Sequence, residues 1–460
     1  MGAMNNIILL TDSYKVSHHK QYPPGTEQVY SYFESRGGRW KDVVFFGLQY
    51  YLREYLHGVR VWRDEIDQAA EYFAKHFGND KIFNREGWDY IVRNHMGALP
   101  VSIKAVPEGS VVPNHNVLMT IENTDPRCFW LTNYLETLLV QVWYGCTVAT
   151  QSREMKKIIL ANLEETGDPA GVGFKLHDFG FRGVSSVETA GVGGAAHLVN
   201  FLGTDTMAAL VVARDYYRCP MAGFSIPAAE HSTITSWGKD HERDAFANML
   251  DQFPEGLVAV VSDSYNIFQA CEKYWGEDLR DRVLSRNGTL VIRPDSGEPT
   301  TVVPTVLDTL GAAFGYEMNS KGYKVLNPHV RIIQGDGIDF DTLGGILQAM
   351  QGRGWSGDNI AFGSGGGLLQ KLNRDTLKFA FKCASVTVNG EQRDVYKQPV
   401  TDFGKVSKAG RMKLVQSGGE LQTVNAHVPG EDLLVEVFRD GKMLRSWSFD
   451  AVRERAKIAQ

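Results

Sequence analysis

The sequence has little of what marks a disulfide-bonded, nucleic-acid-binding or membrane protein. Its 460 residues include five cysteines, an odd number with no Cys-x-x-Cys pair, so we expect free thiols and a reducing, cytoplasmic location. The formal net charge of −6 offers no basic surface for a nucleic acid backbone. No apolar run approaches the ~18 residues of a membrane span, and the first residues lack the regions of a signal peptide.

Two common nucleotide-binding signatures are also absent. No Gly-Lys-Ser or Gly-Lys-Thr follows the glycine-rich stretch at 363–367, and its spacing is not Gly-x-Gly-x-x-Gly, so neither a P-loop nor a dinucleotide fingerprint is present. The composition, 43% hydrophobic and 22% charged, is that of an ordinary globular protein. A chain of this length exceeds one average core, so we expect one large and one smaller domain.

Short apolar stretches end abruptly in polar or glycine-rich clusters throughout residues 151–385. The last apolar residues of seven such stretches are 24 to 41 residues apart: Leu176, Leu202, Ile226, Val261, Ile292, Ile333 and Phe362. A parallel βα unit takes about 30 residues, and a strand buried on both faces reads as continuous apolar sequence. Seven units in series predict an irregular α/β barrel, with its chemistry at the C-terminal strand ends.

The two terminal segments have a different pattern. Residues 1–150 contain alternating strands such as "EQVYSYFESRGG" and one helix-like stretch, "GWDYIVRNHM". Residues 386–460 contain two hairpin signals, "NGEQ" and "RDGK". We expect these segments to build together a second, smaller α/β domain beside the barrel.

Four glycines occupy five positions in "GSGGG", residues 363–367, between an apolar run and a helix-like pattern. Backbone N–H groups at a helix N-terminus bind anions without side chains, so this loop is a candidate phosphate site. A tight turn beside another backbone is the alternative. Arg374 and Lys382 follow the loop and could complete the anion site, or be ordinary surface.

Three further strand ends carry aspartate: Asp263, Asp295 and Asp336. Such carboxylates can hold ribose hydroxyls or, through water, Mg²⁺. Arg293 lies two residues before Asp295, so both point the same way on an extended strand. An arginine beside acids suits a ligand with phosphate and hydroxyl groups, although a purely structural ion pair has the same pattern.

The stretch "SIPAAEHSTITSW" places Glu230 and His231 after a proline and two alanines. The small residues clear space around the histidine, which favours a titrating or nucleophilic role over a structural one. The next histidine, His241, is ten positions on, so metal binding is not indicated.

Two other strand ends offer contacts for a flat ligand. Phe179 could stack on a planar ring, or belong to the core, and Arg182 follows it by three residues. Asp205, after "NFLGT", could accept hydrogen bonds from an amide.

Taken together, these stretches resemble the nicotinamide phosphoribosyltransferase family. The matching segments run from residue 9 to about 385: "LLTDSYKVSHHKQYPPGTEQVYSYFESR", "KLHDFGFRGVSS", "NFLGTDT", "PAAEHSTITSWGKDHE", "VSDSYN", "IRPDSG", "IQGDG" and "FGSGGGLLQKLNRD". The resemblance implies synthesis of nicotinamide mononucleotide and pyrophosphate from nicotinamide and phosphoribosyl pyrophosphate with Mg²⁺. It also implies ATP hydrolysis coupled through a phosphohistidine, an irregular barrel plus a smaller domain, and a homodimer with shared active sites.

The resemblance also implies roles for individual residues. Phe179 and the partner subunit's Tyr14 would stack on the pyridine ring, while Arg182 and Asp205 would address the carboxamide and disfavour nicotinate. His231 would be phosphorylated, supported by Glu230 and Asp263, and Asp263 and Asp295 would address Mg²⁺ through water. The residues implied for ribose and phosphates are Arg293, Asp295, Gly335, Asp336, Gly365, Gly366 and Arg374. Those implied for pyrophosphate or ATP phosphates are Arg36, Lys382, Lys397 and Lys405.

Some features leave other functions open. Nicotinate phosphoribosyltransferase shares the fold and chemistry. Ala259 stands where the animal members have serine, so a polar contact near the carboxamide is expected to be absent, which bears on affinity and not on the chemistry. A barrel aldolase or isomerase would want a strand-end lysine, for which Lys175 is the one candidate. A non-enzymatic extracellular signalling role is the most distant alternative. The absence of any Asp-Asp pair agrees with the barrel class of phosphoribosyltransferases.

Overall fold

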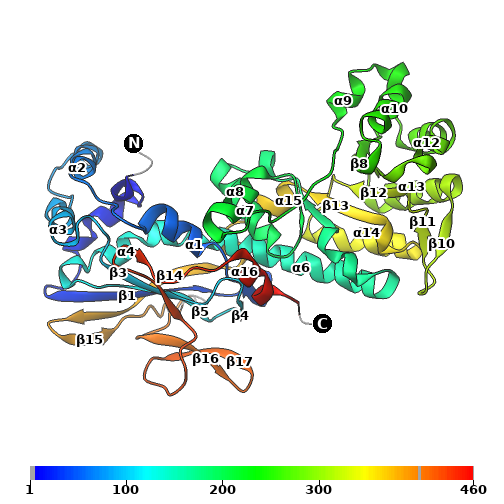
Figure 1. The fold of residues 1–460 in the computed structure, drawn as a ribbon. Helices are drawn as coiled ribbons and strands as arrows, with labels where there is room; N and C mark the ends of the chain where they lie inside the picture. The colour runs from blue at the N-terminus through cyan, green and yellow to red at the C-terminus, as the bar shows by residue number, and fades with distance from the viewer. Residues whose placement is uncertain (1–5, 402–405, 459–460) are drawn as a thin grey trace. The chain divides into compact units, whose positions relative to one another are not determined.

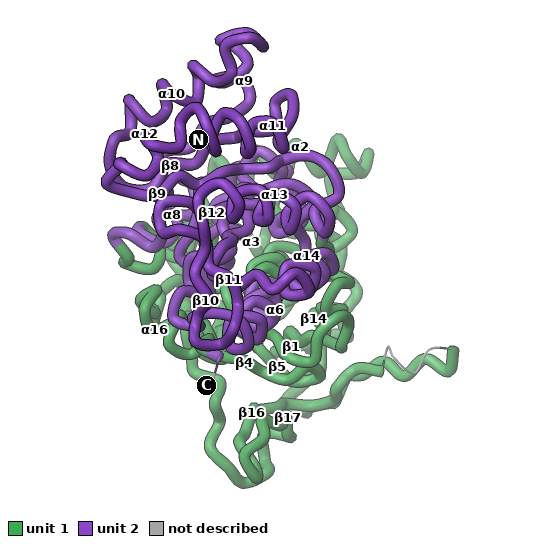
Figure 2. The backbone as a smooth tube through the Cα atoms, turned by 90° about the vertical axis from the view of Figure 1, so that its right-hand side faces the viewer, with its two compact units in different colours: residues 1–150, 215–219, 372–457 green, residues 151–214, 220–371, 458–460 purple. Residues whose placement is uncertain are grey.

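The chain divides into two units, and its two terminal segments share one of them (Figure 2). The computed structural model describes residues 6–401 and 406–458. Unit 1 consists of residues 1–150, 215–219 and 372–457, and unit 2 of residues 151–214, 220–371 and 458–460. The unit of the terminal segments, expected to be the smaller, is similar in length to the other.

Unit 1 is built on a seven-stranded antiparallel sheet (Figure 1). Its strands, in spatial order, are β15 (Glu391–Asp394), β14 (Phe379–Val388), β1 (Thr26–Ser35), β5 (Val117–Asn123), β3 (Val101–Ala105), β18 (Val435–Arg439) and β19 (Lys442–Met443). The N-terminal strands β1, β5 and β3 form the centre of this sheet, and C-terminal strands flank them on both sides, because β1 pairs with β14 and β3 with β18. Strand β14 therefore belongs to unit 1, although part of it falls within the predicted barrel segment.

Both predicted hairpins are present in this sheet. Asn389 and Gly390 turn β14 into β15, and Asp440 and Gly441 turn β18 into β19. All four residues have positive φ, from 48° to 78°, as a two-residue turn matched to the strand twist requires. Across the sheet, Val29 of β1 packs on Val386 and Val388 of β14 in a buried cluster.

The remaining elements of unit 1 are short strands and helices. The strands are β2 (Asp42–Val44) with β4 (Val111–Pro113), and β16 (Met412–Ser417) with β17 (Glu420–Asn425). The helices are α1 (Leu48–Tyr51), α2 (Arg63–Phe77), α3 (Arg85–His95), α4 (Leu131–Tyr134), α5 (Glu136–Leu139) and α16 (Phe449–Ala456). Helix α3 confirms the helix predicted from "GWDYIVRNHM". Helices α6 (Val142–Thr166) and α8 (Met207–Tyr217) continue from one unit into the other.

The seven apolar stretches of unit 2 form a closed parallel ring. Six strands pair in the order β7 (Gly203–Thr204), β6 (Leu176–Asp178), β13 (Ile360–Ser364), β12 (Val330–Gln334), β9 (Asn287–Arg293) and β8 (Glu255–Val261). The seventh stretch closes the ring through single bridges, from Phe224 to Gly203 and from Ala228 to Ala259. Pro227 lies between them and has no N–H to donate to a ladder, which explains why this side of the barrel is irregular.

Helices surround this ring. They are α7 (Val187–Leu198), α9 (His231–Thr235), α10 (Glu242–Gln252), α11 (Ile267–Gln269), α12 (Arg280–Ser285), α13 (Pro299–Phe314), α14 (Phe340–Gly352) and α15 (Gly366–Leu369), with a hairpin of β10 (Tyr316–Met318) and β11 (Lys324–Leu326). Helices α13 and α14 pack against each other beside β12 (Figure 1). The architecture is thus the irregular α/β barrel with a second α/β region that the sequence predicts.

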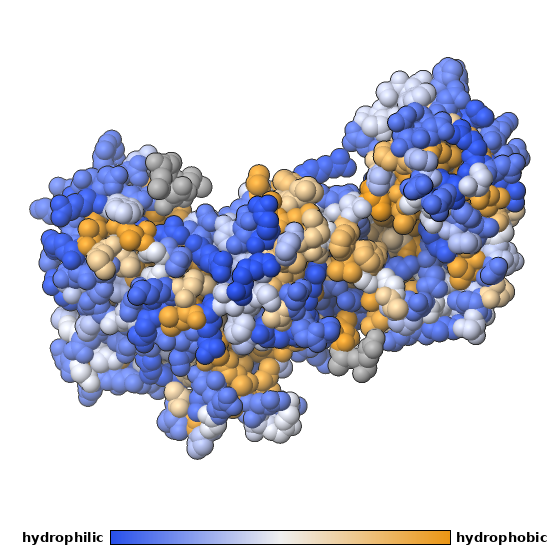
Figure 3. Space-filling view, in the orientation of Figure 1, coloured by the Kyte–Doolittle hydropathy of each residue, from blue (hydrophilic) through white to orange (hydrophobic). Residues whose placement is uncertain are grey.

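The surface and the thiols agree with the composition. On the face drawn in Figure 3 hydrophilic side chains predominate, and apolar ones gather in separate patches. None of the described helices combines the length and apolarity that crossing a membrane requires. All five cysteines are free.

Candidate active site

A cavity of about 800 Å³ occupies the barrel of unit 2. Five of the predicted site residues line it: Phe179, Arg182, Asp205, Glu230 and Arg293. Arg182 follows Phe179 by three positions, and the other three come from different strand ends, 26 to 114 positions after Phe179. Ala259, Val291 and Ile333 form a buried apolar layer of the barrel, against which Phe179 packs. The strand ends therefore surround a cavity with an apolar wall and charged side chains.

The ring of Phe179 is held by the glycine cluster. The N–H of Phe179 donates to the carbonyl of Ser364 at 2.9 Å, which places the ring against β13. A Cβ at residue 363 would overlap this ring, and one at Gly335 would lie 3.3 Å from its Cε2. The guanidinium of Arg293 lies over the ring, 5.4 Å from the centroid, in cation–π contact. Gly363 thus serves an aromatic side chain rather than a phosphate.

The other three glycines of the cluster differ among themselves. A Cβ at Gly367 would lie 2.6 Å from the carbonyl oxygen of Ile338, so this glycine serves a close backbone approach. Around Gly366 nothing lies within 4 Å, and Gly365 meets only the carbonyl of Phe179, at 3.5 Å. The helix that follows, α15, is a single turn. Only Gly365 and Gly366 therefore stay candidates for phosphate contact.

Asp205 is fixed by two neighbours in the cavity wall. His177 Nε2 lies 3.0 Å from its Oδ1, and the hydroxyl of Ser225 donates to the same oxygen. Burial tends to raise the pKa of Asp205, but the hydrogen bonds from His177 and Ser225, with a smaller effect of Arg293, hold the pKa below its ordinary value. The cavity therefore contains an oriented, ionised carboxylate.

His231 is the exposed member of a carboxylate network. Its Nε2 lies 3.0 Å from Oδ1 of Asp263, and its Nδ1 lies 4.0 Å from Oδ2 of Asp295. The His231 side chain is 47% exposed, whereas that of Asp263 is 3% exposed. Asp263 Oδ2 also accepts from the N–H of Asp295, at 3.1 Å, and from the hydroxyl of Ser296, at 2.6 Å. The buried Asp263 thus orients the imidazole ring of His231, which stays partly exposed to solvent.

Arg293 and Asp295 point the same way, as the strand alternation predicts. The arginine Nε and Nη2 both donate to Oδ1 of Asp295, at 3.1 and 2.8 Å. Glu230, by contrast, accepts from the hydroxyl of Ser232, its partner in the structure, rather than contacting His231. Asp336 is exposed after β12. Lys175 donates to three backbone carbonyls, of residues 357, 358 and 360, each at 3.0 Å, which leaves it engaged in structure rather than poised as a Schiff-base amine.

Comparison with known proteins decides the family. The model of the nicotinate phosphoribosyltransferase family matches residues 174–442, and that of the nicotinamide phosphoribosyltransferase N-terminal domain matches residues 6–103. The chain belongs to the nicotinate phosphoribosyltransferase family. It is therefore an enzyme, a phosphoribosyltransferase.

Relatives cover this phosphoribosyltransferase from end to end. A nicotinamide phosphoribosyltransferase of Xanthomonas campestris is 52% identical over 472 aligned positions, covering 100% of each chain. One of Acinetobacter baylyi is 32% identical and covers 96% of this chain and 95% of its own.

Two solved structures share the fold at low identity. A nicotinate-nucleotide pyrophosphorylase from Pyrococcus furiosus has a TM-score of 0.61 at 16% identity, covering 99% of this chain and 96% of its own. Human nicotinic acid phosphoribosyltransferase has a TM-score of 0.56 at 17% identity, covering 97% of this chain and 93% of its own.

Three other predicted site residues of this phosphoribosyltransferase, Arg36, Arg374 and Lys382, lie in unit 1 and form a cationic group. The pKa of Lys382 is lowered, first by burial and then by the positive charges of Arg36, Arg374 and Lys15. The negative charge of Glu136 opposes this shift. Arg36 pairs with Glu34 at 2.8 Å. These charges are close enough to affect one another, as expected of an anion site.

Three more predicted residues belong to unit 1 or fall outside the description. Tyr14, in the 3₁₀ helix η3 (Ser13–Lys20), is 59% exposed and has the ring of His18 edge-on at 5.0 Å. The N–H of Lys397 donates to the hydroxyl oxygen of Ser407, and the N–H of Ser407 donates to the carbonyl of Lys397. Lys405 lies outside the described residues.

Sequence reasoning missed the residues that orient the site. His177, Ser225 and Ser296 each bind a predicted carboxylate. His177 precedes Phe179 by two positions, so strand alternation could have pointed both into the cavity. Glu242, buried as the first residue of α10, was also missed. Burial and then the charge of Asp263 raise its pKa to about 7, so Glu242 is a further carboxyl group near Asp263.

Proposed function

We propose that this phosphoribosyltransferase transfers the phosphoribosyl group of phosphoribosyl pyrophosphate to nicotinamide in the salvage of pyridine nucleotides. The observation that carries the proposal is the ionised Asp205 in the wall of the cavity, held by His177 and Ser225. A carboxylate there accepts hydrogen bonds from a carboxamide NH₂ and repels the carboxylate of nicotinate. The 52% identity to a nicotinamide phosphoribosyltransferase supports the same acceptor.

The reaction asks the protein to hold a flat base behind the ribose. The pyridine nitrogen attacks C1 of the sugar, and the bond from C1 to the pyrophosphate oxygen breaks, so positive charge develops on the sugar and negative charge leaves. Phe179, fixed under Arg293, would align the ring, and cations would receive the leaving anion. Arg36, Arg374 and Lys382 are suited to that second task, as are Lys397 and Lys405.

The sugar and its phosphate would lie near the carboxyl ends of β9, β12 and β13. We propose that Asp295 and Asp336 accept from ribose hydroxyls and that Arg293 offsets phosphate charge. Gly335 and the open backbone at Gly365 and Gly366 would admit the phosphate closely. Arg182, exposed on the cavity rim, would contact the carboxamide together with Asp205.

The carboxylates near His231 fit a magnesium ion held through water. Asp263 already accepts three hydrogen bonds, so it would reach the ion through coordinated water, a mode that Mg²⁺ favours. Asp295 Oδ2, which is not the oxygen bound by Arg293, would supply a second oxygen to such a shell. Bound there, the ion would offset the charge of the pyrophosphate.

We also propose that ATP hydrolysis is coupled to the transfer through His231. With Asp263 accepting from Nε2–H, Nδ1 keeps its lone pair and can attack the γ-phosphorus of ATP. The bond between that phosphorus and the β–γ bridging oxygen breaks, and ADP leaves. Glu230, the residue before helix α9, would help to position the phosphorylated His231 by accepting hydrogen bonds from neighbouring donors. New negative charge on His231 would strengthen binding of the metal-bound substrate.

The assembly and location follow from the same proposal. We propose a homodimer in which the partner subunit's Tyr14 covers the base opposite Phe179, because Tyr14 exposes 59% of its surface. The free thiols are consistent with a reducing cytoplasm.

Pyrophosphate release tests the proposal directly. The purified chain is supplied with phosphoribosyl pyrophosphate, Mg²⁺ and either nicotinamide or nicotinate, with and without ATP. We expect release with nicotinamide, faster when ATP is present, and little with nicotinate. Equal or greater release with nicotinate would instead assign the chain to the nicotinate enzymes. An ATP-independent rate would remove the coupling through His231.

A further inference from the structure

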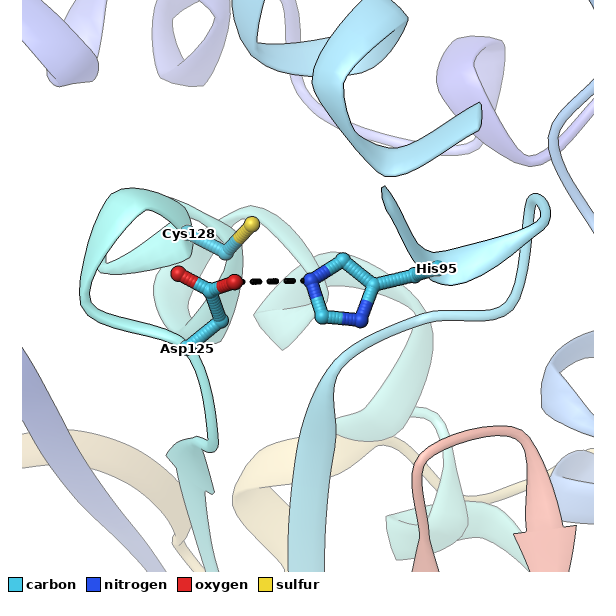
Figure 4. Close-up of side chains that lie close together, drawn as sticks. All are labelled: His95, Asp125 and Cys128. Carbon is cyan, nitrogen blue, oxygen red and sulfur yellow. Dashed lines mark hydrogen bonds and ion pairs between the residues drawn. The ribbon is translucent and has the colours of Figure 1, made fainter. Parts of the chain in front are cut away.

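Three potential metal ligands of unit 1 lie together, outside every residue assigned above. His95 ends helix α3, Asp125 precedes the 3₁₀ helix η5 (Pro126–Cys128), and Cys128 ends it. One ligand atom from each lies within 4.8 Å of the other two. Figure 4 shows the carboxylate and the sulfur on one side and the imidazole ring facing them. Nitrogen, oxygen and sulfur donors thus converge on one point.

The carboxylate of this cluster is held in place before any ion arrives. Its Oδ1 accepts from the N–H of Arg127 at 2.8 Å, and its Oδ2 accepts from the hydroxyl of Tyr90 at 2.9 Å. His95 Nε2 lies 2.8 Å from the same Oδ2. The cluster therefore contains an oxygen ligand that is already held in position by hydrogen bonds.

The donor set selects the kind of ion. Mg²⁺ and Ca²⁺ prefer shells of oxygen, whereas imidazole and thiolate are ligands of zinc. Zinc bonds of about 2.0 to 2.3 Å place tetrahedral ligand atoms roughly 3.3 to 3.7 Å apart. Ligand atoms up to 4.8 Å apart would move inward, whereas His95 Nε2 and Asp125 Oδ2, 2.8 Å apart, would separate slightly as the ion replaces their hydrogen bond. The side chains of His95 and Asp125 are 24% and 17% exposed, which gives an ion a route from solvent.

The charges also balance. On binding, zinc would displace the proton of the Cys128 thiol. The carboxylate and the resulting thiolate then offset both charges of the ion. The guanidinium of Arg127 lies 4.1 Å over the ring of Tyr90 and is the nearby positive charge that opposes binding.

We propose that His95, Asp125 and Cys128 bind one zinc ion, with water as the fourth ligand, and so join the end of α3 to the segment before α4. The site is independent of the transferase reaction. Its role is to strengthen the attachment of helix α3 to the segment before α4, which Trp88 already contacts through Trp130.

Cobalt(II) is the probe, because a thiolate bound to cobalt gives a near-ultraviolet charge-transfer band. The full chain, freed of metal with a chelator, is titrated with cobalt in excess Mg²⁺ and then with zinc. We expect the band to saturate at one cobalt per chain and to disappear when zinc displaces it. Cys128→Ser should lose the band, and His95→Gln should weaken binding at least tenfold. Cys383→Ser, which changes a partly exposed thiol outside the cluster, should leave both the band and the affinity unchanged.

A measurement of stability separates a metal site from a merely hydrogen-bonded cluster. Zinc should raise the Tm of the wild-type chain and not that of His95→Gln, since an ion that binds only the folded state stabilises it. Circular dichroism of the metal-free variants checks that each folds. A wild-type chain without the charge-transfer band, or a band that persists in a folded Cys128→Ser variant, would overturn the proposal.

Discussion

Two buried carboxylates, Asp263 in unit 2 and Glu108 in unit 1, each accept three hydrogen bonds but belong to different kinds of network. Asp263 accepts from His231, Ser296 and the N–H of Asp295. Glu108 accepts from the N–H groups of residues 47 and 49 and from the hydroxyl of Tyr217.

The difference lies in the donors rather than in the acids. His231 exposes 47% of its side chain, whereas Tyr217 is fully buried. A buried carboxylate whose partner is exposed to solvent can orient that partner for a reaction. A buried carboxylate whose partners are all buried stabilises the fold. Burial of a carboxylate is therefore not by itself a sign of function.

The largest effect expected is at the exposed end of the Asp263 network. His231→Ala should abolish ATP-coupled turnover and leave some basal transfer, because the nucleophile is lost while the cavity stays intact. Pyrophosphate release and ATP hydrolysis are measured together. His241→Ala removes a comparably exposed histidine that pairs with Asp244 and should retain coupling. Undiminished coupling in His231→Ala would contradict the assignment.

The second effect concerns the choice between amide and acid. Like charges 4 Å apart cost about 4 kcal/mol at an effective dielectric of 20, less where water screens them. Asp205→Asn should therefore reduce the preference for nicotinamide over nicotinate by on the order of tenfold to a hundredfold, seen as the ratio of the two kcat/KM values. An unchanged ratio would place the selectivity elsewhere.

The same carboxylate predicts a pH dependence. Because hydrogen bonds outweigh burial and lower the pKa of Asp205, it stays ionised as pH falls through the ordinary aspartate range near 3.8. The preference for nicotinamide should thus persist over the whole pH range in which the enzyme is folded. A preference that titrates away around neutral pH would contradict an ionised Asp205 as its source.

A third, smaller effect separates two glycines of one loop. Gly363→Ala puts a methyl group into the ring of Phe179 and should raise the KM for nicotinamide on the order of tenfold, by misplacing the ring. Gly366→Ala points its methyl into open space and should raise the KM for phosphoribosyl pyrophosphate instead. If both variants raised the same KM, the two glycines would share one role.

The smallest catalytic effect is expected in the closed network. Glu108→Gln places an amide NH₂ among donors that need an acceptor and should cost about 1 to 3 kcal/mol of unfolding free energy, with ATP coupling unchanged. Burial raises the pKa of Glu108 above 4.5, so its contribution to stability is full below pH 4.5 and decreases as pH rises toward the folded-state pKa. Denaturant unfolding of both chains across pH checks the slope, which the variant should lack.

Local pattern predicted a good part of the fold. Continuous apolar runs located every stretch of the ring, because strands buried on both faces need them, and Asn-Gly and Asp-Gly located both hairpins. The pairing of β1 with β14 could not be read from pattern, since it joins residues more than 340 positions apart. The single-bridge closure at Phe224 and Ala228 likewise depends on how the ring curls.

The site was predicted less completely. Strand alternation put Arg293 and Asp295 together correctly, and Phe179, Asp205 and Glu230 do line one cavity. The neighbours that orient them, His177 and Ser296, have no motif of their own, because an ordinary histidine or serine acquires its role from what lies opposite it.

By itself, the sequence determined the types of element, the residues at the strand ends and, through long ordered matches, the family. Only the tertiary structure decided what each of those residues touches: that Gly363 makes room for an aromatic ring, that Glu230 contacts Ser232 instead of His231, and that Lys175 is tied to backbone carbonyls. The reason is that periodicity depends on a residue's near neighbours in the chain. Contacts depend on chain segments far away in sequence, which packing alone brings together.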